Sequence, residues 1–170
     1  KGLHCLLNSS DYAQKHKAII NKIIKSGSIN RAMIRFDFHK ELHKLSLKQS
    51  HSSYASALRN FRHYHLLRLW LRELSGYADT EETMTNWSHC ALEIIQHTLS
   101  FCENELRVRY GSPQNKTEGT CQISVSAMGK LGGEELNFSS DIDLIFVYSE
   151  SGQTSGPSCI DNQQYFGILV

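Results

Sequence analysis

The stretch Met128–Phe146, with the sequence MGKLGGEELNFSSDIDLIF, decides how the rest of the chain is interpreted. It contains a double glycine, Gly132 and Gly133, and then two aspartates, Asp141 and Asp143, that flank one apolar residue. A nearly continuous apolar run, LIFV, comes directly after the second aspartate. Because such a run is typical of a strand inside a sheet, both aspartates are predicted to lie on a strand.

The sequence around this stretch favours extended structure. Gln122–Ala127 is predicted to form one strand, Gly129–Gly133 a glycine-rich turn, and Asp141–Tyr148 a second strand. Ser151–Pro157 is expected to be a loop, and a further helix is expected to begin near Asp161.

Helical patterns dominate the chain before this point. Helices are expected over Tyr12–Lys25, Ile29–Lys48, Ser53–Leu74 and from about Asp79 to Gly111. Their order before the strands predicts an α+β fold. The expected domains are a helical region over 1–113 and, over 114–170, the start of a mixed-sheet domain that is truncated at the end of the chain.

Two helices carry more detailed expectations. Asp79 is the expected N-cap of the last helix before the strands, with Glu82 as its capping-box partner. In the second half of Ser53–Leu74 an apolar stripe at helical spacing is formed by Leu66, Leu67, Trp70, Leu71 and Leu74. The polar side chains between them are expected to face away from the core; they are His65, Arg68 and Arg72.

The two aspartates carry the expected chemistry. Side chains alternate along a strand, so Asp141 and Asp143 are expected to share one face. Two carboxylates this close repel each other, and burying them is costly without a cation or hydrogen bonds. Mg²⁺ takes oxygen ligands, including carboxylates and substrate phosphates, and serves phosphoryl transfer. The aspartates are therefore the predicted catalytic and Mg²⁺-binding residues.

The glycines and their neighbours supply a complementary phosphate-binding half. Gly132 and Gly133 allow the backbone to approach a phosphate and to present N–H donors to it. Ser139, Ser140 and Lys130 are further candidates for contacts to phosphate. A lone D-x-D or a lone Gly-Gly turn is a weak signal, and the string is not a P-loop. Strand, double glycine and D-x-D in this order favour the functional interpretation.

Composition limits the classes of partner. The 18 Lys and Arg against 17 Asp and Glu give a formal net charge of +1, which offers no electrostatic reason to expect nucleic acid. No apolar run approaches the roughly 20 residues that span a bilayer, and no signal peptide is found. The five cysteines include no C-x-x-C pair, so neither a disulfide framework nor a zinc site is indicated. The chain is expected to be a cytoplasmic fragment.

The Gly-Gly and D-x-D signature resembles that of the polymerase-beta-type nucleotidyltransferases, which implies that residues 114–170 are the start of a mixed-sheet nucleotidyltransferase core. The longer string Met128–Phe146 resembles a narrower family, the bacterial bifunctional glutamine synthetase adenylyltransferase/adenylyl-removing enzyme. Upstream, LRNFRH (Leu58–His63) and LWLREL (Leu69–Leu74) are similar to helical segments of that family. Its adenylyl-removing copy typically contains ELNFSSDID and its adenylylating copy ELGYSSDLD. Residues 137, 138 and 142 match the former.

This resemblance implies a reaction in which phosphate attacks AMP esterified to a glutamine synthetase tyrosine and ADP is released. Asp141 and Asp143 would hold Mg²⁺, while the glycines and serines named above would position phosphates. The implied partners are glutamine synthetase, a PII signalling protein, ADP or ATP, and phosphate. A third carboxylate is expected on a later strand, beyond Val170, because Glu150 and Asp161 lie in or beside a loop; without it the isolated fragment could be inactive.

Other functions stay open on sequence alone. Within the same family the alternative is adenylylation of glutamine synthetase from ATP. A rival from another class is a non-catalytic regulatory or binding fragment whose helices contact partner proteins. A nucleic-acid polymerase or tRNA nucleotidyltransferase is disfavoured by the near-zero net charge.

Overall fold

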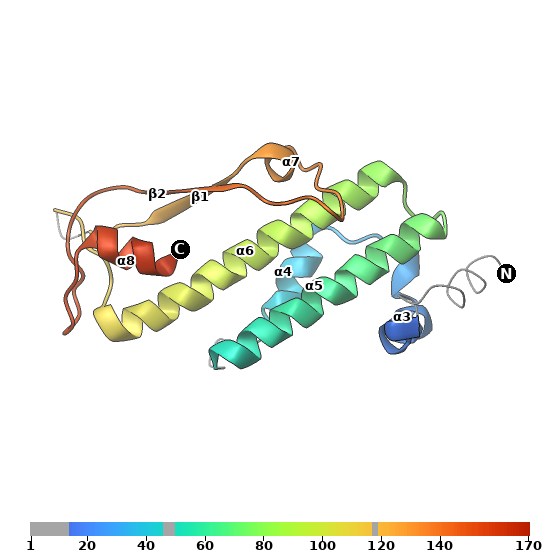
Figure 1. The fold of residues 1–170 in the computed structure, drawn as a ribbon, viewed down its shortest axis with the longest axis horizontal. Helices are drawn as coiled ribbons and strands as arrows, with labels where there is room; N and C mark the ends of the chain where they lie inside the picture. The colour runs from blue at the N-terminus through green and yellow to red at the C-terminus, as the bar shows by residue number, and fades with distance from the viewer. Residues whose placement is uncertain (1–13, 46–49, 117–118) are drawn as a thin grey trace. The chain divides into compact units, whose positions relative to one another are not determined.

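The computed structural model describes residues 14–45, 50–116 and 119–170 of the chain. These residues form two compact units, and Figure 1 shows the helices and strands along the chain. The first unit combines the chain up to Ile94 with Gly133–Ser140, and the second combines Ile95–Gly132 with Asp141–Val170. The chain therefore passes between the units inside the stretch that carries the double glycine and the aspartates.

The elements follow one another as helices first and strands later, so the predicted α+β class is confirmed. In chain order they are α3 (Lys17–Lys25), the 3₁₀ turn η1 (Ser28–Asn30), α4 (Arg35–Leu42), α5 (His51–Leu74), α6 (Thr80–Tyr110), β1 (Ile123–Ala127), α7 (Gly129–Gly132), β2 (Leu144–Tyr148) and α8 (Asn162–Leu169). Within the described residues, none of these helices is long and apolar enough to cross a membrane. The expected domain boundary at residue 113 stays a prediction.

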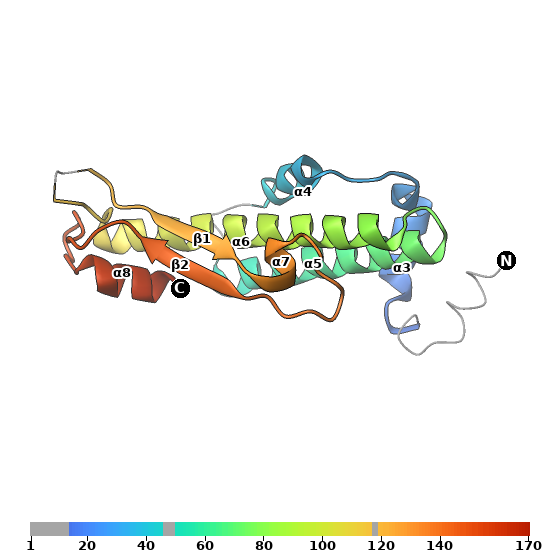
Figure 2. The ribbon, with the colours of Figure 1, turned by 90° about the horizontal axis from the view of Figure 1, so that it is seen from above.

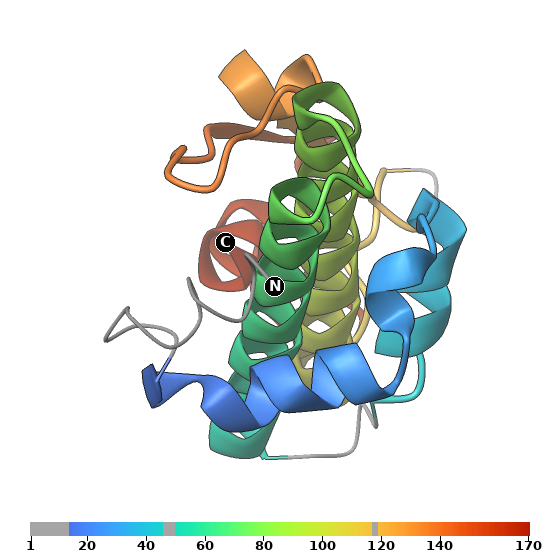
Figure 3. The ribbon, with the colours of Figure 1, turned by 90° about the vertical axis from the view of Figure 1, so that its right-hand side faces the viewer.

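Helix α3 crosses α5 in the first unit, as Figure 3 shows. Ile20 and Ile23 of α3 pack against Leu67 and Leu71 of α5, and all four side chains are buried. Burying an aliphatic side chain of this size contributes roughly 1.5–3 kcal/mol. The apolar stripe predicted from the sequence of α5 is therefore the face that α3 covers.

The polar face predicted for α5 is wrong, because His65, Arg68 and Arg72 are all buried. Arg68 donates from Nε to the Ser28 carbonyl at 3.0 Å and from Nη2 to the Arg31 carbonyl. Arg72 donates from Nη1 to the Ile29 carbonyl at 2.5 Å. A short 3₁₀ turn leaves carbonyls without partners, and the two guanidinium groups supply the missing donors.

The single helix expected over Ile29–Lys48 is also wrong in its span. The chain leaves helical geometry at Arg31, where the backbone is extended, and returns to it only at the start of α4. Asp37 caps the new helix, because its Oδ2 accepts the Ile34 N–H at 3.0 Å. This bond is the main reason that the pKa of Asp37 is lowered. Positions 46–48 of this expected helix lie outside the described residues. Tyr12, where the preceding helix is expected to begin, also lies outside them.

Helix α6 begins where the sequence predicts, since Asp79 Oδ1 accepts the Glu82 N–H at 2.8 Å. The Glu82 carboxylate contacts Arg72 Nη2 at 2.7 Å, which links the start of α6 to the end of α5. In the first unit the two helices lie side by side, joined by a short turn (Figures 1 and 2). The helix ends before Gly111, whose φ of +78° favours glycine.

Strands β1 and β2 form an antiparallel pair in the second unit, and their register runs from Ile123 opposite Tyr148 to Ala127 opposite Leu144. Inner and outer side chains alternate along both strands, as a sheet with one covered face requires. The predicted strand Gln122–Ala127 is confirmed to within one residue.

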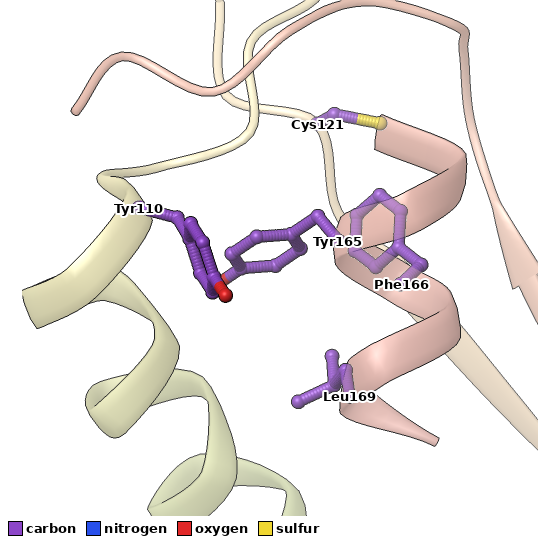
Figure 4. Packing of buried hydrophobic residues seen from close by; sticks show 5 residues of the cluster. All are labelled: Tyr110, Cys121, Tyr165, Phe166 and Leu169. Carbon is purple, nitrogen blue, oxygen red and sulfur yellow. The ribbon is translucent and has the colours of Figure 1, made fainter. Parts of the chain in front are cut away.

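Helix α8 supplies the core of the second unit (Figure 4). Tyr165, Phe166 and Leu169 of α8 pack with Tyr110 from the end of α6 and with Cys121. The Phe166 ring stacks on that of Tyr148 in β2, with centroids 4.8 Å apart. Asp161 caps α8 by accepting the Gln164 N–H at 2.7 Å, so the helix predicted to begin there is confirmed.

Replacing Arg68 with methionine should destabilise α5 locally by about 2–4 kcal/mol, because the carbonyls of Ser28 and Arg31 lose their donor. Hydrogen exchange of α5 amides in the full-length protein measures this opening free energy. Arg59→Met on the exposed face of the same helix is the matched control and should change it by less than about 0.5 kcal/mol. Equal effects of the two substitutions would contradict the role assigned to Arg68.

Replacing Phe166 with alanine should lower the unfolding free energy of the second unit by about 3–5 kcal/mol, since it leaves a cavity beside Tyr148. Pulse proteolysis in increasing urea reports the unfolded fraction. Ile168 of the same helix is 50% exposed, so Ile168→Ala should have a much smaller effect. Similar urea midpoints for both variants would show that Phe166 is not a core residue.

Candidate active site

The glycine-rich turn predicted over Gly129–Gly133 is a single turn of helix, α7, that comes after β1. The Gly132 N–H closes it by donating to the Met128 carbonyl at 3.1 Å. Leu131 is 1% exposed and anchors the turn in the core. A Cβ on Gly132 would lie only 2.5 Å from the Ala127 carbonyl oxygen. Position 132 therefore needs glycine because the backbone of β1 passes so close to it.

Asp141 and Asp143 precede β2, which begins only at Leu144, so the strand predicted over Asp141–Tyr148 is three residues too long at its start. The last contact of the pairing is a hydrogen bond from Met128 N–H to the Asp143 carbonyl at 2.9 Å. Beyond Met128 the first strand turns into α7, so Asp141 has no strand opposite it. Both aspartates are exposed, which avoids the cost of burying their charge.

The carboxylate of Asp143 lies against the start of α7. Its Oδ2 is 3.5 Å from the position that a Cβ on Gly129 would occupy. Gly129 itself has a φ of +54°, which a residue with a side chain adopts only at a cost. The turn thus brings its backbone close to one of the two predicted catalytic carboxylates. Lys130, the cation predicted to contact phosphate, is exposed on the same turn.

The segment between the glycines and the aspartates is held by consecutive residues of α6 in the first unit. Leu136 donates its N–H to Ser88 Oγ at 3.0 Å, and both residues are buried. The Phe138 ring meets the Trp87 ring edge to face, with centroids 5.9 Å apart. These contacts fix the backbone on both sides of Asn137.

Asn137 organises the two serines predicted to position phosphate. Its Oδ1 accepts from the Ser139 N–H at 3.1 Å, from Ser139 Oγ at 3.1 Å and from Ser140 Oγ at 2.7 Å. Sequence reasoning used Asn137 only for family resemblance and missed this role. An asparagine two residues before a serine is a known signal for a side-chain turn.

The donor chemistry of the two aspartates fits a hard cation such as Mg²⁺, which prefers carboxylate oxygens. Across residues 14–45, 50–116 and 119–170, no group of three or more His, Cys, Asp or Glu side chains comes together as a complete metal site. Asp161 is engaged as the cap of α8, and Glu150 is exposed in the loop after β2. The described residues thus offer two carboxylates and leave the third, expected beyond Val170, untested.

Comparison with known proteins adds independent information on this site. Residues 9–170 match the family model described as glutamate-ammonia ligase adenylyltransferase. A relative from Shewanella oneidensis, named bifunctional glutamine synthetase adenylyltransferase/adenylyl-removing enzyme, is 36% identical over 96% of this chain and 18% of its own length. Relatives of the same name from Psychromonas ingrahamii and Nitrosomonas europaea are 46% and 43% identical over 66% and 64% of this chain, each over 12% of the relative.

The chain spans less than one fifth of the length of these relatives. The match includes the helices, α7 and both aspartates, since it runs over nearly the whole sequence. The similarity that the string Met128–Phe146 suggests therefore extends along the chain. The chain belongs to the glutamate-ammonia ligase adenylyltransferase family.

Proposed function

We propose that this chain contributes to the removal of AMP from an adenylylated tyrosine of glutamine synthetase, with inorganic phosphate as the acceptor. Membership of an adenylyltransferase family supports nucleotidyl transfer, and the names of the relatives include both adenylylation and adenylyl removal. The resemblance of Asn137, Phe138 and Ile142 to the removing copy favours removal. The same names support glutamine synthetase as the protein substrate.

The observation that carries the proposal is the placement of Asp143 against α7. The exposed residues Asp141 and Asp143 lie just before β2. The Asp143 carboxylate lies beside α7, which has no side chain at Gly129 or Gly132. Phosphoryl-type transfer depends on positioning and charge neutralisation more than on covalent chemistry by the protein. A glycine turn beside the Asp143 carboxylate is suited to both.

The proposed reaction needs neither an oxidant nor a reductant. An oxygen of phosphate forms a bond to the phosphorus of AMP while the bond from that phosphorus to the tyrosine oxygen breaks. The tyrosine oxygen leaves with the electron pair and takes up a proton, and ADP is the second product. Mg²⁺ held by Asp141 and Asp143 would supply positive charge to the phosphate groups.

Other residues of the chain would position the phosphate groups. Gly132 already uses its N–H inside α7, so its part is to let α7 pack closely against the Ala127 carbonyl. The proposal assigns direct phosphate contacts to the Gly133 amide, to the hydroxyls of Ser139 and Ser140, and to the Lys130 ammonium. A PII signalling protein as regulator and a cytoplasmic location belong to the same proposal.

Asp141→Asn and Asp143→Asn in the full-length protein should each lower ADP formation by about 100-fold or more, because each loses a charge that holds the cation. The assay contains Mg²⁺, phosphate and adenylylated glutamine synthetase. The matched control is Asp161→Asn, which removes a carboxylate but keeps a good helix cap. ADP formation that survives both substitutions would place the chemistry elsewhere. If the substitutions abolish only the transfer of AMP from ATP, the adenylylating alternative is favoured.

Gly132→Ala should lower the same activity by about 10-fold or more, because its methyl group would force α7 away from the Ala127 carbonyl. The rate of ADP release measures the effect. Gly167→Ala on α8 meets no atom within 4 Å and serves as the control that should keep full activity. A Gly132→Ala variant as active as the control would show that the close packing of α7 is not needed.

A further inference from the structure

Asn137 has no role in the proposed reaction beyond its resemblance to the removing copy, although it is the centre of a hydrogen-bond cluster. Its Oδ1 is the common acceptor for three donors that belong to the two serines directly before Asp141. The Asn137 carbonyl adds a fourth contact, since it accepts the Ser140 N–H at 3.2 Å. One side chain therefore sets the conformation of the whole segment 137–140.

The identity of the acceptor atom follows from chemistry. The Ser139 amide can only donate, so the carboxamide atom that faces it must be the oxygen and not the nitrogen. Because the same oxygen faces both hydroxyls, Ser139 and Ser140 direct their protons towards Asn137. Their lone pairs are then turned away from it.

Three donors share an oxygen that has two lone pairs. One of the three bonds is therefore weak, and the hydroxyl that makes it can turn towards a substrate oxygen while the other two bonds persist. The exchange costs little, because a hydroxyl that leaves Oδ1 gains a phosphate oxygen as its new acceptor. Asn137 therefore holds both serine side chains in place, while one hydroxyl can still turn towards a bound phosphate.

Asn137 can act in this way because its own backbone is fixed. Leu136 on one side is bound to Ser88, and Phe138 on the other side rests on Trp87, which is 4% exposed. The guanidinium of Arg62 covers the Trp87 ring at 5.2 Å from its centroid. The support comes from helices α5 and α6, which are rigid elements suited to orienting a loop.

We propose that Asn137 is a positioning residue of the adenylyl-removing reaction, which holds the Ser139 and Ser140 side chains where a hydroxyl can exchange Oδ1 for an oxygen of the phosphate that attacks AMP. This inference rests on the proposed function for its kinetic part. It acts through the serines, so Asn137 touches neither the reacting phosphorus nor the cation. Loss of its oxygen releases both hydroxyls and the Ser139 amide together.

The kinetic test uses the full-length protein with Asn137→Ala, with Ser139→Ala/Ser140→Ala, and with all three substitutions. Asn137→Ala should raise KM for phosphate by about 10-fold with a smaller change in kcat, because the two serine side chains lose the contact that holds them in place. In the double-serine background the same substitution should have no further effect. Effects that add in the combined variant would overturn the proposal, since Asn137 would then act independently of the serines.

A second test does not depend on activity. Hydrogen exchange at the amide of Ser139 should become about 10-fold faster in Asn137→Ala, and Asn137→Asp should restore the slow exchange because it keeps an acceptor oxygen. Asn60→Ala, at an exposed position of α5, is the matched control and should change neither exchange nor KM. Unchanged exchange in Asn137→Ala would overturn the inference. If the unaltered protein forms no ADP from phosphate, the proposed function fails, while the exchange data still decide whether Asn137 organises the loop.

Discussion

The hydrogen bond from Met128 N–H to the Asp143 carbonyl is the contact on which the arrangement of the site depends. It is the last bond of the β1–β2 pairing, and it joins the residue that leads into α7 to one of the two aspartates. A single bond of this kind contributes only about 1 kcal/mol, but its place is fixed by the whole register. A slip of one residue between the strands would turn every side chain to the other face. Asp143 would then no longer lie beside Gly129.

A second constraint is the burial of charge in the helical unit. Burial is the main reason that the pKa of the Arg68 guanidinium is lowered, yet a guanidinium starts from so high a value that it stays charged. Arg68 finds backbone carbonyls in place of a carboxylate, and these belong to η1 and the residue after it. His65 is buried next to it, and its pKa is lowered mainly by burial, although the Glu41 carboxylate partly opposes the shift. The helical unit thus combines apolar packing with buried polar groups that lock a short irregular turn.

Local signals made part of this structure predictable from sequence. Asp79 and Asp161 were identified as helix starts because a side-chain oxygen there pairs with a nearby N–H, which needs no knowledge of the rest of the fold. The strand β1 was predictable from the periodicity of its residues, and the α+β class from the order of the elements. Neither prediction needs knowledge of the rest of the fold. The burial of Arg68 was not predictable, because it depends on where the carbonyls of η1 come to lie. The start of β2 was misjudged at Asp141, because strand ends are set by the partner strand, and β1 turns away at Met128.

The packing of Gly132 changes what the double-glycine motif can tell a reader of related sequences. A side chain at this position is excluded by the Ala127 carbonyl, which belongs to the fold and not to any substrate. A descendant that lost its catalytic activity would still be under pressure to keep that glycine in order to fold. Asp141 and Asp143 are exposed, so relaxed selection would let them drift soon after activity was lost. If the aspartates carry the proposed chemistry, their loss in a related sequence would indicate lost activity, whereas the glycine would indicate only that the turn still forms.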